Sequence, residues 1–273
     1  MKNDNIDHGR AFDWGNTSKD YAKYRDIYPD VFYEKIVDLG LCISGQKVLD
    51  LGTGTGVLPR NMYHYGADWT GADISENQIA EAVRIAAECG MKIRFIAASA
   101  EKTGLPDHAF DVITACQCFF YFDLAKIVPE VVRMLKPNGR LLILFMSWLP
   151  FESEIARTSE DLVLKYNPSW TGANFKCFEP KAPDWASAYF DCVNCLAYNL
   201  EIPFTRDSWH GRIVACRGIG ASSLPQNKID AFKKEHLEYM KTVPERFTIP
   251  HYVTMIDFKS KRPDRCKLLK HLS

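Results

Sequence analysis

The residues best suited to chemistry are three closely spaced glycines, Gly52, Gly54 and Gly56, at the end of the segment VLDLGTGTG. Glycine lets the backbone adopt left-handed angles, and it lets a ligand lie against the main chain with no Cβ in the way. A short apolar run precedes these glycines, and a second unit, GADIS, follows with Asp73 at its centre. A buried strand, a glycine turn that opens a helix, and a second strand ending in a carboxylate together predict a nucleoside pocket at the carboxyl edge of a parallel sheet.

Two carboxylates in these segments have separate expected roles. Asp50 lies near the end of a run, 48–51, that suits a strand covered on both faces. There it can orient the loop or accept a hydrogen bond from a ligand ammonium group. Asp73 can accept both hydroxyls of a ribose, in charge-assisted hydrogen bonds worth ~1.5–3 kcal/mol each. A helix expected over about 57–65 directs its free backbone N–H groups at the ligand. The alternative is a glycine loop that serves only as a turn, with Asp73 capping the next helix.

An acidic residue followed by G-x-G-x-G resembles the first motif of the class I S-adenosylmethionine (SAM) methyltransferases, and it differs from the G-x-G-x-x-G of dinucleotide binders. The segment SAEKTGLPDHAFDVITA resembles this family's adenine-contact segment and fourth strand, and LKPNGRLLIL resembles the stretch leading into its fifth strand. An N-terminal DYAKYRDIYP resembles the Y-x-x-x-R-x-x-Y-P segments that precede the SAM domain in many relatives. The resemblance has specific motifs over about residues 45–147, and it implies SAM as the cofactor.

The resemblance also implies where the parts of SAM lie. It places residues 99–101 beside the adenine and residues 116–117 under the methionine part. It places Tyr21 and Arg25 at the SAM carboxylate or at an acidic acceptor, and a solvated amphipathic helix is the alternative for that segment. Together the motifs and the resemblance imply the following cofactor-binding residues: Tyr21, Arg25, Asp50, Gly52, Thr53, Gly54, Gly56, Asp73, Ile74, Gln78, Ser99, Ala100, Glu101, Cys116 and Gln117.

The pattern beyond the glycine loop alternates between strands and helices. Strands are expected over 93–97, 110–115 and 140–146, and later over 194–202 and 251–258. Strand–helix alternation with right-handed crossovers predicts an α/β fold with a doubly wound, mostly parallel sheet. The resemblance implies that this sheet has seven strands, with an antiparallel last strand beside strand six.

The implied organisation is one SAM-binding core with additions on both sides. Residues 1–44 are expected to form N-terminal helices that cover the cofactor site, and 45–147 the Rossmann-like core. Residues 148–200, rich in Trp, Phe, Tyr and Pro, are expected to form an insertion that acts as a substrate lid, and an ordinary aromatic core is the alternative. Residues 201–273 are expected to complete the same domain.

Methyl transfer from a sulfonium is an in-line displacement, so alignment of the reacting atoms supplies much of the acceleration and no catalytic residue need be visible. A base is needed only for an acceptor that arrives protonated. Tyr121, after the fourth strand, and His210 are the candidates for orienting the acceptor. Trp209 and Arg212, on one face of a helix capped by Thr205, are the candidates for substrate binding. A core tryptophan, surface basic residues and a structural histidine are the alternatives.

The composition argues against several classes of protein. Among 273 residues, 34 Lys+Arg balance 34 Asp+Glu, so the chain lacks the basic footprint of a nucleic-acid binder. The basic stretch 259–270 is expected to be a solvated tail. Neither a signal peptide nor a run of ~18 apolar residues is visible, so no membrane partner is expected. Nine scattered cysteines, without the spacing of a zinc site, suit a reducing cytoplasm and predict no metal.

We therefore expect a cytoplasmic SAM-dependent methyltransferase that acts on a small molecule. O-methylation of a carboxylate or a hydroxyl is favoured, while N- or C-methylation and a homodimer stay open. Methylation of a thiol or of arsenite would need Cys116, Cys118 and Cys216 to converge on the pocket mouth. A nicotinamide-dependent oxidoreductase, which the glycine spacing disfavours, and a non-catalytic SAM-binding regulatory protein are the alternatives from other classes.

Overall fold

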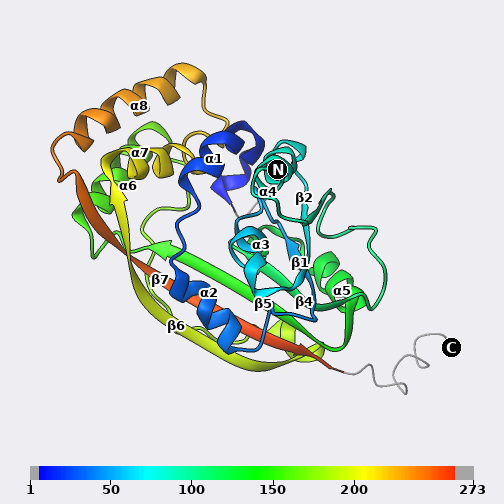
Figure 1. Cartoon of the computed structure of the whole chain (residues 1–273). Coiled ribbons are helices and arrows are strands. Elements are labelled where there is room, and N and C mark those ends of the chain that lie inside the picture. Colours follow the sequence, from blue (N-terminus) through cyan, green and yellow to red (C-terminus); the bar gives the residue numbers. More distant parts are fainter. Residues whose placement is uncertain (1–5, 262–273) are drawn as a thin grey trace.

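The computed structural model describes residues 6–261 and is built around a seven-stranded sheet (Figure 1). Strands β1 to β5 pair in parallel, and the order across the sheet is β3-β2-β1-β4-β5-β7-β6. β7 pairs antiparallel with both β5 and β6, which confirms the predicted antiparallel last strand. The strands are β1 (Lys47–Leu51), β2 (Asp68–Asp73), β3 (Arg94–Ala97), β4 (Phe110–Cys116), β5 (Leu135–Trp148), β6 (Phe190–Thr205) and β7 (Arg246–Ser260).

Helices flank the sheet, and α6, α7 and α8 gather at the end where β6 and β7 extend beyond the other strands (Figure 1). Helix α1 lies between α7 and α4, so the N-terminal segment reaches the edge of the sheet at which β1 and β2 end. The helices are α1 (Ser18–Tyr24), α2 (Asp30–Asp38), α3 (Val57–Asn61), α4 (Glu76–Glu88), α5 (Leu124–Met134), α6 (Glu154–Tyr166), α7 (Arg206–Val214) and α8 (Gln226–Met240).

The central strands are buried on both faces, as their continuous apolar runs predict. In β1, Val48 belongs to the hydrophobic core under α2, α6, α7 and α8, whereas Leu49 belongs to the core under α5. In β5, Leu142 belongs to the first of these cores and Leu141 belongs to the second. Successive side chains of a strand point to opposite faces, so one run of sequence supplies both cores.

The cluster Lys136-Pro137-Asn138-Gly139 contains residues that ordinarily break regular structure, but it lies within β5. Phe110 pairs with Leu135 and Val112 pairs with Arg140, so the four breaker residues form a bulge between these two pairs. β5 therefore begins before the expected start at residue 140. β6 likewise begins at Phe190, so the last part of the expected insertion 148–200 is strand.

One expected helix is shorter in the structure, and another begins at the expected cap. The helix expected over about 57–65 ends at Asn61 and is followed by a separate 3₁₀ turn, Tyr63–Tyr65. Helix α7 has the expected Thr205 cap but ends at Val214, so Cys216 lies beyond it and does not share the helix face with Trp209 and Arg212.

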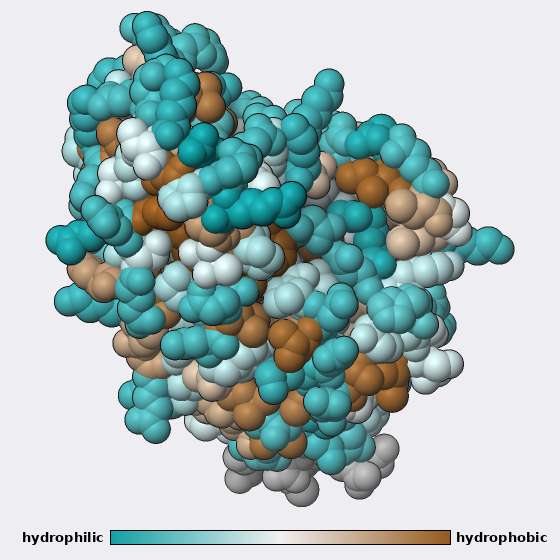
Figure 2. All heavy atoms as spheres, turned by 60° about the vertical axis from the view of Figure 1, so that its left-hand side comes forward, coloured by the Kyte–Doolittle hydropathy of each residue, from teal (hydrophilic) through white to brown (hydrophobic). Residues whose placement is uncertain are grey.

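The surface seen in Figure 2 is mostly hydrophilic, with hydrophobic residues in hollows and in small separate patches. Within residues 6–261, no helix is long and apolar enough to span a bilayer. The expected basic tail falls largely outside the described residues, which end at Lys261.

Candidate functional site

A cavity of about 540 Å³ opens at the carboxyl ends of β1, β2 and β4, the edge at which open α/β sheets bind ligands. We call it the cofactor cavity. Tyr121 lines it, as do most of the residues predicted to bind a cofactor: Tyr21, Arg25, Gly52, Gly54, Asp73, Ile74, Gln78, Ser99, Ala100, Glu101, Cys116 and Gln117. The sequence analysis missed further lining residues: Asp13, Trp14, Ala72, Ser75, Ala98, Cys118, Phe120 and Phe122.

Asp73 ends β2, and its carboxylate ties that strand to the glycine loop. Its Oδ2 accepts the Gly54 N–H at 2.9 Å, and its Oδ1 accepts the Ser75 N–H at 2.8 Å. Ser75 is the cap of α4, because its Oγ accepts the Gln78 N–H. Burial raises the pKa of Asp73, and the two backbone hydrogen bonds oppose this shift. A carboxylate has about four acceptor sites, so Asp73 retains capacity for two ligand donors.

The glycine loop needs its glycines for two different reasons. Gly52 has a φ of +60°, and a Cβ there would lie 2.7 Å from the Cβ of Cys118. Gly54 has a φ of +55°, and a Cβ there would lie 3.6 Å from the Tyr21 ring, in the space between the loop and the N-terminal segment. Gly52 therefore lets the loop after β4 pack closely, whereas Gly54 keeps a cradle open to a ligand.

Three residues predicted to bind the cofactor, Asp50, Thr53 and Gly56, lie behind the glycine loop and do not line the cavity. Asp50 is buried and accepts the Thr114 hydroxyl at 2.7 Å, and burial raises its pKa to about 7. The Thr53 N–H donates to a β2 carbonyl at 3.0 Å. A Cβ at Gly56 would lie 2.8 Å from the ring of Phe95. These three residues fix the shape of the loop from its far side.

The N-terminal segment brings an arginine to the cofactor cavity. The Arg25 guanidinium lies 4.5 Å from the centroid of the Tyr21 ring and 5.2 Å from that of Trp14. No carboxylate within residues 6–261 forms an ion pair with Arg25. Helix α1 packs closely on α7, because a Cβ at Gly211 would collide with the ring of Tyr24. The segment therefore holds a cation ready for an anionic ligand.

The N-terminal segment makes two further contacts that the sequence analysis did not predict. Asp13 accepts the Gly15 N–H at 2.8 Å and so caps the short helix Trp14–Thr17, as aspartate at such a position predicts. The carbonyl of Trp14 accepts the Gln78 Nε2–H at 2.9 Å, which ties the segment to α4. The other polar atom of that amide, Gln78 Oε1, is buried and finds no partner among the described residues.

The loop after β4 forms the wall opposite the glycines. Gln117 adopts a φ of +65°, and its Nε2 donates to the carbonyl of Met146 at 2.5 Å. Tyr121 lies against Phe12 and Phe120, with ring centroids 5.4 and 4.3 Å away. Burial raises the pKa of Tyr121 to about 12, although the positive charges of Arg217 and Arg25 oppose the shift. The Tyr121 phenol is therefore protonated at neutral pH.

The structure does not bring Trp209 or His210 to the cofactor cavity. Trp209 is fully buried, and its Nε1–H donates to Ser159 Oγ at 2.9 Å. Nδ1 of His210 lies 2.8 Å from Nδ1 of His236, whose Nε2 lies 3.0 Å from Ser159 Oγ. Burial lowers the pKa of His236 to about 3, with a smaller effect from His210, and burial also lowers that of His210. These side chains form a neutral core network that joins α6, α7 and α8.

Arg212 does not line the cofactor cavity, but it lies close enough to Arg25 for the two charges to interact. It is 6% exposed, its guanidinium stacks 5.0 Å from the Trp148 ring, and its Nε and Nη1 have no partner among the described residues. Burial lowers its pKa, and the positive charge of Arg25 adds to this effect. Arg217, by contrast, pairs with Asp7 at 2.5 Å. Arg25 and Arg212, neither of which forms an ion pair with a carboxylate within residues 6–261, thus lie within electrostatic range of each other.

The thiols at this end of the sheet are poorly suited to nucleophilic or metal chemistry. Cys116 and Cys118 line the cofactor cavity, whereas Cys216 is buried outside its lining. Burial raises the pKa of all three, that of Cys116 to about 12, so they are protonated thiols at neutral pH. Among residues 6–261, no three His, Cys, Asp or Glu side chains are grouped to hold a metal ion.

Residues 49–143 match the family model described as a methyltransferase domain. The chain is 36% identical to YcgJ of Bacillus subtilis, an uncharacterised methyltransferase, over 203 residues that cover 69% of this chain and 76% of YcgJ. It is 29% identical to the ubiquinone biosynthesis O-methyltransferase of Pseudomonas putida over 64% of this chain and 78% of that enzyme.

A third relative is matched over a shorter span. The demethylmenaquinone methyltransferase of Thermus thermophilus is 39% identical over 113 residues, so the match covers 40% of this chain and about half, 51%, of that enzyme. The crystal structure of YcgJ has the same fold, with a TM-score of 0.51 over 84% of this chain and 97% of that chain.

Proposed function

The chain belongs to the class I SAM-dependent methyltransferases, and we propose that it transfers the methyl group of SAM to an oxygen atom of a small molecule, a hydroxyl or a carboxylate. The observation that carries this proposal is the cofactor cavity, in which Asp73 and Arg25 face one ligand space. Bound SAM supplies an electrophilic methyl group on a sulfonium. The protein then needs to hold the methyl donor and the methyl acceptor in line.

Three features of the cofactor cavity fit an adenosyl group. Asp73 retains acceptor sites for the two hydroxyls of a ribose, and it is already held in place by backbone N–H groups. Gln78 Oε1 is a buried acceptor with no partner in the described part of the chain, and an unsatisfied buried acceptor of this kind costs about 1–3 kcal/mol until a ligand donor reaches it. The open space over Gly54 admits a ligand close to the main chain. Residues 99–101 line the part of the cavity proposed for the adenine.

Arg25 suits the carboxylate of the methionine part of SAM. A guanidinium can grip a carboxylate through two parallel hydrogen bonds, and Arg25 has no such partner within the described chain. Tyr21 and Trp14 pack against the guanidinium and restrict its position before a ligand arrives. The nearby charge of Arg212 adds to the positive potential at this end of the cavity, which favours an anionic acceptor oxygen as well.

The acceptor side of the cavity is proposed at Gln117 and Tyr121. A protonated Tyr121 can donate a hydrogen bond to an acceptor oxygen, and an acceptor that arrives as an anion needs no base. The name of the Pseudomonas putida relative, an O-methyltransferase, supports oxygen as the methylated atom. The name of the Thermus thermophilus relative, a demethylmenaquinone methyltransferase, supports a quinone-type molecule as a second class of acceptor.

The acceptor atom can be tested with SAM that carries a ¹³C-labelled methyl group. We expect the purified protein, incubated with this SAM and a bacterial metabolite extract, to form a labelled product whose methyl chemical shift is that of an O-methyl group. The heat-inactivated protein is the control. A labelled product with an N-methyl or C-methyl shift would contradict the oxygen assignment, and no labelled product from any extract would favour a non-catalytic SAM-binding protein.

A further inference from the structure

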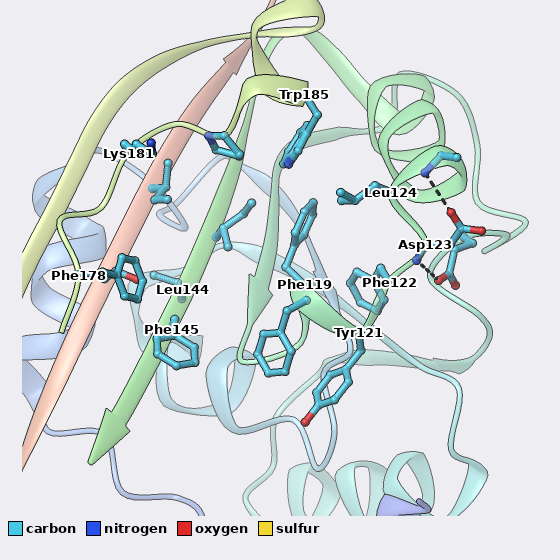
Figure 3. Close-up of a pocket in the computed structure, with 17 residues that line it drawn as sticks. Phe119, Tyr121, Phe122, Asp123, Leu124, Leu144, Phe145, Phe178, Lys181 and Trp185 are labelled. Atoms are coloured by element: carbon cyan, nitrogen blue, oxygen red, sulfur yellow. Dashed lines mark hydrogen bonds between the residues drawn. The ribbon is translucent and has the colours of Figure 1, made fainter. Parts of the chain in front are cut away.

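A second and larger cavity, of about 920 Å³, lies beside the cofactor cavity, and most of its lining residues have no part in the proposed binding of SAM (Figure 3). We call it the aromatic groove: its floor is β5 and β7, one wall is the loop 119–125, and the other is the segment 178–185. The two cavities share four residues, Glu101, Phe120, Tyr121 and Phe122. The two cavities therefore adjoin, and Tyr121, on the proposed acceptor side of the cofactor cavity, borders both.

The floor of the groove is a sheet face that no helix covers fully. Ile143 of β5 pairs with Ile256 of β7, and Phe145 pairs with Thr254, so the side chains at these positions share one face. Ile143, Phe145 and Ile256 remain partly exposed. An apolar sheet face is normally buried against a second layer. Here the layer consists of α5 on one side and the extended segment 178–185 on the other, with a gap between them.

The segment 178–185 is fastened at both ends. Phe178 packs on Tyr252 with ring centroids 5.8 Å apart, and Trp185 stacks on Phe119 at 5.5 Å. Figure 3 shows Phe178, Lys181 and Trp185 along one side of the groove, with Phe119, Phe122 and Leu124 along the other. Because aromatic contacts hold both ends of this wall, the width of the groove is set by the fold rather than by an unattached loop.

Each of the two carboxylates in the groove is held by contacts with neighbouring residues. Glu101 accepts the Ser99 hydroxyl at 2.5 Å and the Asp123 N–H at 3.2 Å. Asp123 accepts the Ala125 N–H at 3.1 Å (Figure 3). It also pairs with Lys126 at 2.8 Å. The surface left for a ligand is therefore mainly apolar, and Phe120, Leu124 and Phe178 are 49%, 43% and 50% exposed on it. Exposed apolar surface gathered in one concave place marks a binding site.

We infer that the aromatic groove binds the apolar body of the methyl acceptor, an alkyl chain or extended ring system whose polar head reaches Tyr121 and the cofactor cavity. This inference rests on the proposed function. Its basis is that Phe120, Tyr121 and Phe122 line both cavities, which places the groove directly beside the proposed acceptor side of the cofactor cavity. The acceptor is accordingly an amphipathic molecule, with an oxygen-bearing head and a substantial apolar part.

The inference can be tested with 4-alkylbenzoic acids that carry a methyl, butyl or octyl group, titrated calorimetrically into the protein with and without S-adenosylhomocysteine (SAH). Each fully buried methylene group strengthens binding about fourfold. Because the groove is open on one side, we expect a total gain of about 100-fold from the methyl to the octyl compound. This gain should be present both with and without SAH.

Matched variants test whether the gain in affinity arises in the groove. Phe178→Asp and Leu124→Asp place a charge on opposite walls of the groove, and we expect each to remove most of the 100-fold gain. Phe178→Asp also removes the contact with Tyr252, whereas Leu124→Asp leaves the segment 178–185 in place, because Leu124 is exposed and an acidic residue is well tolerated in the first turn of α5. A loss shared by the two variants therefore reports on the groove and not on that contact. Phe151→Asp is the control, because Phe151 is 51% exposed, close to the 50% of Phe178, and does not line the groove.

Equal affinities for the three compounds in a protein that binds SAH would overturn this inference and leave the proposed function intact. Failure to bind SAH would instead contradict the proposed function. If the protein were a dimer and Phe178→Asp, but not Phe151→Asp, made it monomeric in analytical ultracentrifugation, the groove would be an interface between two copies of the chain. That outcome would also overturn the inference.

Discussion

Replacing Asp73 by alanine is expected to weaken the binding of SAH by at least about 100-fold in calorimetric titration. The proposed contact consists of two charge-assisted hydrogen bonds from the ribose hydroxyls, each worth ~1.5–3 kcal/mol. Together they correspond to a loss of about 10²–10⁴ in affinity. The carboxylate also accepts the Gly54 N–H, so the substitution removes an anchor of the glycine loop as well. 5′-Methylthioadenosine, which has the ribose but no amino-acid part, should lose affinity to a similar extent.

Two further variants separate the ribose contact from other effects. Asp68→Ala changes an exposed aspartate at the opposite end of the same strand, and the affinity for SAH should stay within about twofold of that of the wild type. Arg25→Met should weaken SAH by about 10–100-fold but leave 5′-methylthioadenosine unchanged, because the proposed Arg25 contact is to the carboxylate. Wild-type affinity of Asp73→Ala for both ligands would refute the ribose role.

Replacing Ser159 by alanine is expected to lower the free energy of unfolding by about 2–6 kcal/mol without changing the affinity for SAH. The Ser159 hydroxyl donates to the carbonyl of Ile155 at 2.7 Å, so the ring N–H groups of Trp209 and His236 must both donate to its oxygen. Alanine leaves these two buried donors unsatisfied, at about 1–3 kcal/mol each. Urea denaturation followed by circular dichroism measures the change.

The result for Ser159→Ala distinguishes a core role of Trp209 and His210 from a role in substrate binding. Ser187→Ala is the control, because Ser187 is exposed and its hydroxyl donates only to a nearby carbonyl within its own turn. If Ser159→Ala unfolded at the urea concentration of the wild type but lost methyl transfer, the network would belong to the active site and the interpretation of it as core would be wrong.

The cofactor side could be predicted from the sequence because its signals are local. A strand, a glycine loop and a second strand that ends in Asp73 follow one another closely in the chain, and parallel pairing of β1 with β2 brings them together. What local signals could not decide is which members of a motif face the ligand. Asp50 and Thr53 flank Gly52 and have the right chemistry, yet their side chains lie behind the loop. Successive side chains of a strand point to opposite faces, and the tight turn after β1 changes the direction of the chain, so only some residues of the motif face the cavity.

Tyr121 could be proposed from its place after the fourth strand, but the surroundings of α7 and the aromatic groove could not be predicted, because they depend on packing between distant segments. The sequence of α7 shows a tryptophan, a histidine and basic residues, but it does not show that α6 and α8 enclose Trp209 and His210. The aromatic groove likewise requires β5, β7 and the segment 178–185 to meet. At Lys136–Gly139 the local signal was misleading, because pairing with β4 on both sides tolerates these residues as a bulge.

A crystal structure of the protein with SAH tests the central claim most directly. We predict SAH in the cofactor cavity, with both ribose hydroxyls on the Asp73 carboxylate, the adenine beside residues 99–101 and the carboxylate of the amino-acid part on Arg25. Crystals grown with saturating SAH in which this cavity holds no ligand, or in which SAH lies elsewhere on the protein, would contradict the account.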